Sequence, residues 1–352
     1  MVAGVLLVSA CGSSSKGSGS TSAGGNGSSA DLSSLKGTLN GSGSSFQQTF
    51  DEAAIAGFQE KASGVTINYA GGGSGKGKQD LADKVVDFAG TDSLVKPADE
   101  SKYTGGGGIL YFPTVAAPIT ISYKLSGVDN LKLDAATIAK IFQGDIKKWN
   151  DAAIKALNSG ASLPSTDIVP VHRSDASGTT SNFSKYLDAA ATGTWTLGAS
   201  DTLTWPSGGQ AGNGNSGVAQ IVKSTDGAIG YVDLADATNS GLQTAQVKNK
   251  AGKFVAPTLD AAAAAVAGAT VEANLTYSPL DAPGDAAYPL TSPTWIIVYK
   301  NQAKKDKGDA MKAFLNFVLT DGQALAKDAG YAKLPSALAQ KAITQLGQLK
   351  IG

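Results

Sequence analysis

Residues 65–79, which read VTINYAGGGSGKGKQ, indicate the fold more directly than any other part of the chain. Residues 65–70 predict a strand, the glycines after them predict a loop, and a helical segment follows. The same strand and helix signals recur along the chain and predict an α/β fold with mostly parallel sheets. Further strands are expected at 85–89, 109–115, 168–172, 228–232 and 295–299, and helices at 46–62, 133–142, 179–190, 259–267 and 310–319.

Two apolar segments, 109–122 and 289–299, are long enough to carry the chain from one lobe to another. If both cross, the two ends of the sequence form one lobe and the middle forms the other, with a hinge between them. We therefore expect lobe I to contain residues 35–117 and 289–352, and lobe II to contain residues 118–288.

The chain begins with a short apolar run that ends in Ser9-Ala10-Cys11. This run resembles a bacterial lipobox, so residues 1–11 are interpreted as a lipoprotein signal region with Cys11 as the lipidated residue. Fourteen of the next eighteen residues, 12–29, are Gly or Ser. Such a segment buries no core, and we predict a flexible linker over 12–34 that tethers the globular part to the membrane.

Charge and composition exclude several classes of protein. The chain has 29 basic and 29 acidic residues, so it lacks the positive surplus typical of nucleic-acid binding. Its single Cys and single His leave no intrachain disulfide and no Cys/His zinc site. We expect no nucleic-acid partner, no metal and no cofactor.

Four loops rich in Gly, Ser and Thr follow predicted strands and precede helices, at residues 41–46, 71–79, 90–93 and 172–180. Backbone N–H groups at such glycines and at helix N-termini, together with hydroxyl groups, bind anions. Each loop taken alone is also explained by turns and helix caps. Four of them, joined by an arginine and an aspartate, favour an anion site.

The second loop nearly matches a nucleotide-binding P-loop, because Gly72 and the pair Gly77-Lys78 have the spacing G-x-x-x-x-G-K. Gln79 stands where the P-loop has the Ser or Thr that binds Mg²⁺, which argues against a nucleotide site. The Gly41-Ser42-Gly43 step begins a dinucleotide fingerprint, but Phe46 occupies the position of its third glycine.

Order and spacing of these loops make the chain resemble the phosphate-binding proteins of bacterial high-affinity phosphate ABC transporters, which have the two-lobed class II periplasmic-binding-protein fold. The resemblance runs from about residue 37 to the C-terminus and includes 41–46, Gly73-Ser74, 86–92, 112–114, 144–149, 173–179, 227–232 and 288–292. It implies that phosphate oxygens are held by Ser45, the Phe46 amide, Ser74, Ser177, Gly178 and Thr179, with Arg173 and Asp92 completing the site. Ala176 departs from the family pattern, which has Gly there, so the turn must use ordinary φ and ψ.

Two side chains fit a phosphate site for clear chemical reasons. Arg173 can bind two oxygens at once, and Asp175 can hold it in orientation. Asp92 would repel a fully ionised anion, but it can accept a hydrogen bond from protonated phosphate; sulfate has no such proton. Asp92 is therefore predicted to set specificity. His172 is predicted to be structural, since neighbouring strand residues point to opposite faces.

The sequence thus predicts a monomeric extracytoplasmic solute-binding lipoprotein, anchored to the cell membrane through Cys11. It would bind inorganic phosphate between its lobes and deliver it to the permease of an ABC importer. One alternative keeps the fold but binds sulfate, molybdate or a phosphorylated organic compound. The other is a phosphatase-like enzyme with Ser177 as nucleophile, although the single His leaves no evident triad.

Overall fold

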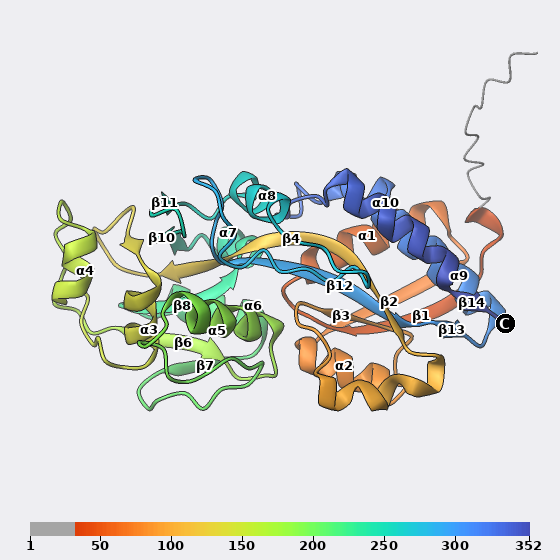
Figure 1. The fold of residues 1–352 in the computed structure, drawn as a ribbon, viewed down its shortest axis with the longest axis horizontal. Helices are drawn as coiled ribbons and strands as arrows, with labels where there is room; N and C mark the ends of the chain where they lie inside the picture. Colours follow the sequence, from red (N-terminus) through yellow and green to blue (C-terminus); the bar gives the residue numbers. More distant parts are fainter. Residues whose placement is uncertain (1–31) are drawn as a thin grey trace, which may run out of the picture. The chain divides into compact units, whose positions relative to one another are not determined.

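The computed structural model describes residues 32–352, and two long strands run through the middle of the fold. These are β4 (Ile109–Tyr123) and β12 (Thr291–Tyr299), which pair antiparallel (Figure 1). Every residue of β12 is buried, and so is every residue of β4 after Ile109. Because both faces of such strands are covered, their sequences are nearly continuous apolar runs. They are the two crossover segments that the sequence predicts.

Lobe I is built on one side of this central pair. Strand β12 pairs antiparallel with β3 (Phe88–Thr91), and β3 pairs parallel with β1 (Gly37–Gly43). The edge strand β2 (Val65–Gly71) also runs parallel to β1. Because β1, β2 and β3 are parallel, their carboxyl ends lie at one edge, where α/β folds bind ligands.

Lobe II continues from the far half of β4. This strand pairs with β12 as far as Pro118 and with β8 (Ala228–Asp233) from Ile119 onward. Strand β8 pairs parallel with β6 (Val169–Arg173), and β6 pairs parallel with β7 (Gln210–Gly212). The parallel strands therefore form the outer part of each lobe, while the pairs made by β4 and β12 are antiparallel. The change of partner lies beside the predicted limit of lobe I at residue 117, although the full lobe limits remain predictions.

Helices pack on both groups of strands and connect them (Figure 1). In lobe I they are α1 (Gln48–Lys61), α2 (Ser74–Ala82), α9 (Lys305–Leu319) and α10 (Ser336–Gln345). In lobe II they are α3 (Ala135–Phe142), α4 (Ala152–Leu157), α5 (Gly178–Ala190), α6 (Gly214–Ser224), α7 (Leu234–Ser240) and α8 (Leu259–Ala267). Short 3-10 turns lie at Leu32–Ser34, Pro97–Gly106, Asp321–Leu325 and Leu346–Gln348, and minor strands are β5 (Lys132–Leu133), β9 (Gln243–Thr244), β10 (Gln246–Lys248), β11 (Phe254–Val255), β13 (Asn301–Gln302) and β14 (Lys350–Ile351).

One strand lies later in the chain than its apolar pattern predicts. Residues 85–89 were expected to form it, but β3 begins at Phe88 and runs to Thr91. Lys84 has a φ of 59° and Val85 is 68% exposed, so both belong to a turn. The Asp87 carboxylate then accepts a hydrogen bond of 2.9 Å from the Asn40 amide, which fixes the entry to the strand.

The predictions for the N-terminal segment lie mostly outside the described residues. This holds for the signal region, for Cys11 and for residues 12–31 of the linker. The last three linker residues, Leu32–Ser34, form a 3-10 turn. From Leu32 to Gly352, no helix combines the length and the apolar character that crossing a membrane requires.

Candidate functional site

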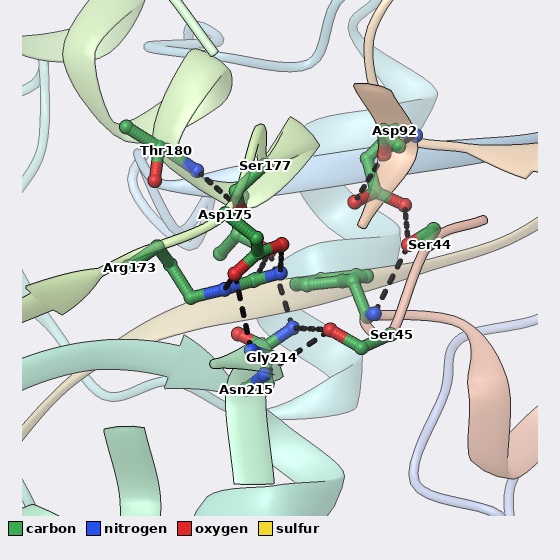
Figure 2. A network of polar contacts seen from close by, with 12 residues as sticks. Ser44, Ser45, Asp92, Arg173, Asp175, Ser177, Thr180, Gly214 and Asn215 are labelled. Carbon is green, nitrogen blue, oxygen red and sulfur yellow. Dashed lines mark hydrogen bonds and ion pairs between the residues drawn. The ribbon is translucent and has the colours of Figure 1, made fainter. Parts of the chain in front are cut away.

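The candidate site lies where three strand ends meet (Figure 2). Ser44 and Ser45 follow β1, Asp92 follows β3, and the start of α5 follows β6. All three are carboxyl ends of parallel strands, at the position expected for a ligand site in this class of fold. The first two loops come from lobe I and the third comes from lobe II.

Asp92 is the acceptor of the lobe I half of this site. Its side chain is almost fully buried, with the residue only 2% exposed. The Ser44 hydroxyl donates to Asp92 Oδ1 at 2.5 Å, and the Ser74 hydroxyl donates to Oδ2 at 3.3 Å. Burial raises the pKa of Asp92 to about 7, against the opposing effects of the Ser44 hydrogen bond and the Arg173 charge. Asp92 is thus a carboxyl group poised between its two protonation states near neutral pH.

Arg173 supplies the positive charge, at the end of β6. It is 4% exposed, and its Nε and Nη2 atoms donate to the two carboxylate oxygens of Asp175 at 2.8 and 2.5 Å. Its Nη1 donates to Thr179 Oγ1 at 3.2 Å. Burial alone would raise the pKa of Asp175, but the hydrogen bonds and charge of Arg173 outweigh burial and lower it. Asp175 therefore holds the Arg173 guanidinium in a fixed orientation, and we call this pair the Arg173 fork.

The N-terminus of α5 faces the lobe I loops. Ser177 is its N-cap, and the Ser177 hydroxyl accepts from the Thr180 amide at 3.1 Å. A Cβ atom added to Gly178 would lie 2.4 Å from Ser74 Oγ and 2.7 Å from Asp92 Oδ2. Glycine is therefore the residue that lets this helix end approach Asp92. The first N–H groups of a helix have no intrahelical partner, so they are available to an anion here.

Ser45 and Phe46 lie at the start of α1. Ser45 Oγ accepts hydrogen bonds from the backbone and side-chain nitrogens of Asn215 at 3.1 and 3.3 Å, across the two lobes. The Phe46 amide donates to Ser44 Oγ at 3.0 Å, and the Phe46 ring is completely buried. The structure therefore brings all eight residues that the sequence assigns to the anion into one cluster, with Asp175 beside Arg173.

The Ala176 turn is accommodated without a left-handed backbone. Ala176 is not among the residues with positive φ. Its carbonyl accepts a hydrogen bond of 2.9 Å from the Gly75 amide of lobe I. A Cβ atom added to Gly75 would lie 2.3 Å from the Ala176 methyl group, so these two loops are in direct contact.

Four residues of the site were missed in the sequence: Ser44, Asn182, Gly214 and Asn215. The Gly214 amide donates to Asp175 Oδ1 at 3.1 Å, and the Asn215 side chain donates to Thr179 Oγ1 at 3.2 Å. Asn182 donates to the Asp92 carbonyl at 2.7 Å and to Ser292 Oγ at 2.9 Å. The glycine-rich run before α6 was a usable signal for Gly214 and Asn215. Asn182 lies inside a predicted helix and gave none.

His172 lies apart from the Arg173 guanidinium. Its ring stacks on Trp205 with centroids 4.8 Å apart and is half-buried. Burial lowers the pKa of His172, which favours the neutral ring. Over residues 32–352, His, Cys, Asp and Glu side chains form no group of three suited to a metal ion. The cluster around Asp92 thus contains hydroxyl and amide donors, one arginine and one protonatable acceptor, which suits binding of a small protonated oxyanion.

Comparison with known proteins identifies the family. Residues 20–322 match the family model described as the PBP superfamily domain. The chain is 36% identical to the phosphate-binding protein PstS 2 of Mycobacterium tuberculosis, over 97% of this chain and 94% of that protein. It is also 36% identical to the phosphate-binding protein PstS of Pasteurella multocida, over 86% and 88%.

Solved structures share the fold. A high-affinity periplasmic phosphate-binding protein, PfluDING, bound with phosphate, superposes with a TM-score of 0.74 at 22% identity, covering 90% of this chain and 96% of that one. The phosphate-binding protein of Stenotrophomonas maltophilia gives a TM-score of 0.65 at 20% identity, covering 88% and 94%. At these identities the similarity speaks for the two-lobed fold.

Proposed function

The chain belongs to the PBP superfamily and, within it, to the PstS phosphate-binding proteins, and from this premise we propose that it binds inorganic phosphate between its lobes for import by an ABC transporter. The site's loops come from both lobes, so the ligand would be enclosed when they close. The closed protein would then present phosphate to the membrane permease.

One observation carries this proposal: a buried acceptor, Asp92, stands among donors that suit an anion. A site made for a fully ionised anion would gain nothing from a carboxylate there, since the two negative groups would repel. HPO₄²⁻ and H₂PO₄⁻ each carry an O–H group that can donate a hydrogen bond to Asp92. The unpaired acceptor that sulfate would leave discriminates strongly against it.

The remaining contacts follow from the donors around Asp92. We assign phosphate oxygens to the hydroxyls of Ser45, Ser74, Ser177 and Thr179, to the amides of Phe46, Gly178 and Thr179, and to Arg173. In this structure several of these groups form hydrogen bonds within the protein, for instance Ser45 with Asn215 and Arg173 with Thr179. Phosphate would take over part of these bonds, and Asp175 would keep Arg173 in place.

The same proposal includes the cellular setting. The protein would act outside the cytoplasm as a monomer, tethered through lipidated Cys11 and the Gly/Ser-rich segment that follows it. The lipobox-like run before Cys11 supports the anchor, and the PstS relatives support action outside the cytoplasm. Mass spectrometry of the protein extracted from its own membrane tests this part: a diacylglycerol-modified Cys11 supports the anchor, and an unmodified Cys11 contradicts it.

Isothermal titration calorimetry with phosphate and sulfate tests the binding function. The expected result is micromolar or tighter phosphate binding, which requires about 8 kcal/mol of net binding free energy. At pH 9, about two units above the pKa of Asp92, the carboxylate is ionised and sulfate should bind roughly a hundredfold more weakly than phosphate, because it leaves this acceptor unpaired. Equal affinity for the two ions would remove the role assigned to Asp92.

We assign no catalytic step to the site. Ser177 Oγ accepts the Thr180 amide hydrogen bond of its helix cap, and the His172 ring stacks on Trp205 instead of approaching Ser177. Incubation with a chromogenic phosphate ester checks this assignment. Turnover that survives purification to constant specific activity, and that is lost in Ser177→Ala, would contradict it.

A further inference from the structure

Lys78, the lysine that makes 72–78 resemble a P-loop, is not among the residues that we assign to phosphate. It is only 8% exposed, which is unusual for lysine. Its Nζ donates to Ser93 Oγ at 2.8 Å and to the Leu94 carbonyl at 3.3 Å, both within lobe I. Its third partner is Asp201 Oδ2 at 3.1 Å, on a residue 123 positions away in sequence.

Asp201 belongs to lobe II, in the segment between α5 and β7, and is 7% exposed. Its other carboxylate oxygen pairs with Lys96 Nζ of lobe I at 2.7 Å. Burial acts to raise the pKa of Asp201, but the Lys78 charge and the hydrogen bonds of both lysines outweigh it and bring the pKa to about 2. One ionised lobe II carboxylate is thus held between two lobe I cations.

This cluster lies directly behind both halves of the proposed site. Ser93, which binds Lys78, follows Asp92 in sequence. The Asp201 carbonyl accepts a hydrogen bond of 2.9 Å from the amide of Ser177, the N-cap of α5. A single chain of contacts therefore runs from the Asp92 loop through Lys78 and Asp201 to Ser177 at the N-terminus of α5. Its two linking residues, Lys78 and Asp201, are not assigned to phosphate.

From this arrangement we infer that Lys78, Asp201 and Lys96 form an ionic latch that holds the two lobes together over bound phosphate and aligns Asp92 with the start of α5. The inference rests on the proposed phosphate binding. Lys78 and Asp201 are positioning residues in it, since neither touches the ligand. When the lobes separate, Lys78 and Asp201 are both exposed to water. The latch therefore stabilises only the closed state.

Replacing only Asp201 should accelerate phosphate release more than replacing both Lys78 and Asp201. A buried charge that loses its partner is strongly unfavourable, whereas replacing both charges by neutral groups of similar size costs much less. Asp201→Asn leaves Lys78 unpaired inside the closed form, and we expect phosphate release to become roughly 10- to 100-fold faster. Association should stay within about twofold, because the lysines are not removed and phosphate enters only those molecules whose lobes are apart at that moment.

The test measures association and release of radiolabelled phosphate by rapid filtration for the parent, Asp201→Asn, Lys78→Met and the double variant. We expect Asp201→Asn to release phosphate fastest, and the double variant to release it more slowly than Asp201→Asn. Lys78→Met should have the smaller effect among the single variants, since Lys96 still neutralises Asp201. Additive effects in the double variant, or unchanged release in Asp201→Asn, would overturn the latch.

The matched control is Asp321→Asn, which breaks the exposed pair of Lys61 and Asp321 within lobe I, 2.6 Å apart. It should leave both rates unchanged. Thermal unfolding without phosphate checks that each variant folds, and the double variant keeps the test decisive if Asp201→Asn unfolds.

Small-angle X-ray scattering without phosphate separates failure of the latch from failure of the phosphate proposal. Asp201→Asn should scatter as a more open particle than the parent and than Asp321→Asn. If the parent binds no phosphate, the function proposed above is wrong and scattering alone decides on the latch, with identical curves overturning it. If the parent binds phosphate and neither the release rate nor the scattering changes, only the latch is wrong.

Discussion

The Ser44 hydroxyl donates a hydrogen bond of 2.5 Å to Asp92 Oδ1, in a setting where both residues are almost fully buried. Ser44 stabilises the ionised form of Asp92, while burial stabilises the protonated form. The balance decides whether Asp92 accepts a hydrogen bond from the ligand or donates one to it. Phosphate selectivity in the proposed function therefore depends on this serine as well as on the aspartate.

The first prediction concerns Asp92→Asn. The asparagine side chain can donate a hydrogen bond to sulfate, which the carboxylate cannot do. We expect phosphate affinity to fall by roughly tenfold, the effect of one charged hydrogen bond, and sulfate affinity to rise. Calorimetry with both ions gives the two values. A variant with the selectivity of the parent would show that Asp92 is not the discriminating group.

The second prediction concerns Ser44→Ala. Loss of the hydroxyl removes the hydrogen bond that lowers the pKa of Asp92, so more of Asp92 is protonated at pH 7. The preference for phosphate over sulfate should fall by roughly 3- to 10-fold. Ser42→Ala is the matched control, because Ser42 also donates to a carboxylate, Asp80, at 2.7 Å but does not touch Asp92. The control should keep the selectivity of the parent.

The third prediction is the pH dependence of sulfate binding. Asp92 has a pKa of about 7 in the unliganded protein, so it is protonated below that pH and its O–H can donate to sulfate. Above pH 7, sulfate binding requires uptake of one proton, and its affinity should fall by about tenfold per pH unit. Calorimetry from pH 5 to pH 9 measures this slope. In Asp92→Asn, which has no proton to exchange, the slope should disappear, and its persistence would assign the proton to another group.

The fourth prediction concerns the Arg173 fork. Asp175→Asn places an amide group against the guanidinium, and Arg173→Lys removes the bidentate geometry. Each should weaken phosphate binding by roughly 10- to 100-fold, and the double variant should lose less than the product of both. Lys148→Met, which breaks the exposed pair with Asp167 in lobe II, is the control and should bind as the parent does. Strictly multiplicative losses in equilibrium titrations would mean that the two residues act separately.

The features that could be predicted from the sequence are those set by residues close together in the chain. The loops around Ser45, Asp92 and Ser177 carry glycines and hydroxyls next to strands, and these local signals identified them. Ser45 was assigned through the family resemblance, whereas the role of Ser44 depends on its tertiary contact with Asp92, which no local pattern reveals.

Contacts between distant segments left no signal of this kind. The Lys78–Asp201 pair spans 123 residues, and the Ser45–Asn215 contact spans 170. The sequence around Lys78 resembles a nucleotide-binding loop, and no pattern around Asp201 indicated a partner for it. The boundary of β3 was misplaced for a related reason, because Asp87 is held by Asn40 and by Lys307, which lies 220 residues away. Local patterns therefore locate a strand or loop, and long-range partners decide its ends and its role.

The fifth prediction concerns Asp51, a buried carboxyl of α1 that accepts a hydrogen bond of 2.8 Å from Gln47. Burial raises the pKa of Asp51 to about 8, with the Asp92 charge acting in the same direction and the Gln47 hydrogen bond opposing both. Between pH 4 and pH 8 the folded protein therefore keeps a proton on Asp51 that the unfolded chain has released. Stability falls with rising pH wherever the unfolded state binds fewer protons.

Asp51→Asn removes this titration while keeping the shape of the side chain. The free energy of unfolding of the variant, relative to the parent, should rise as the pH increases from 4 to 8, by at most about 1.4 kcal/mol per pH unit. It should level off above pH 8, where Asp51 is ionised in both states of the parent. Urea unfolding of both proteins without phosphate measures the difference. A difference that stays constant over this range would show that the folded protein ionises Asp51 as readily as the unfolded chain does.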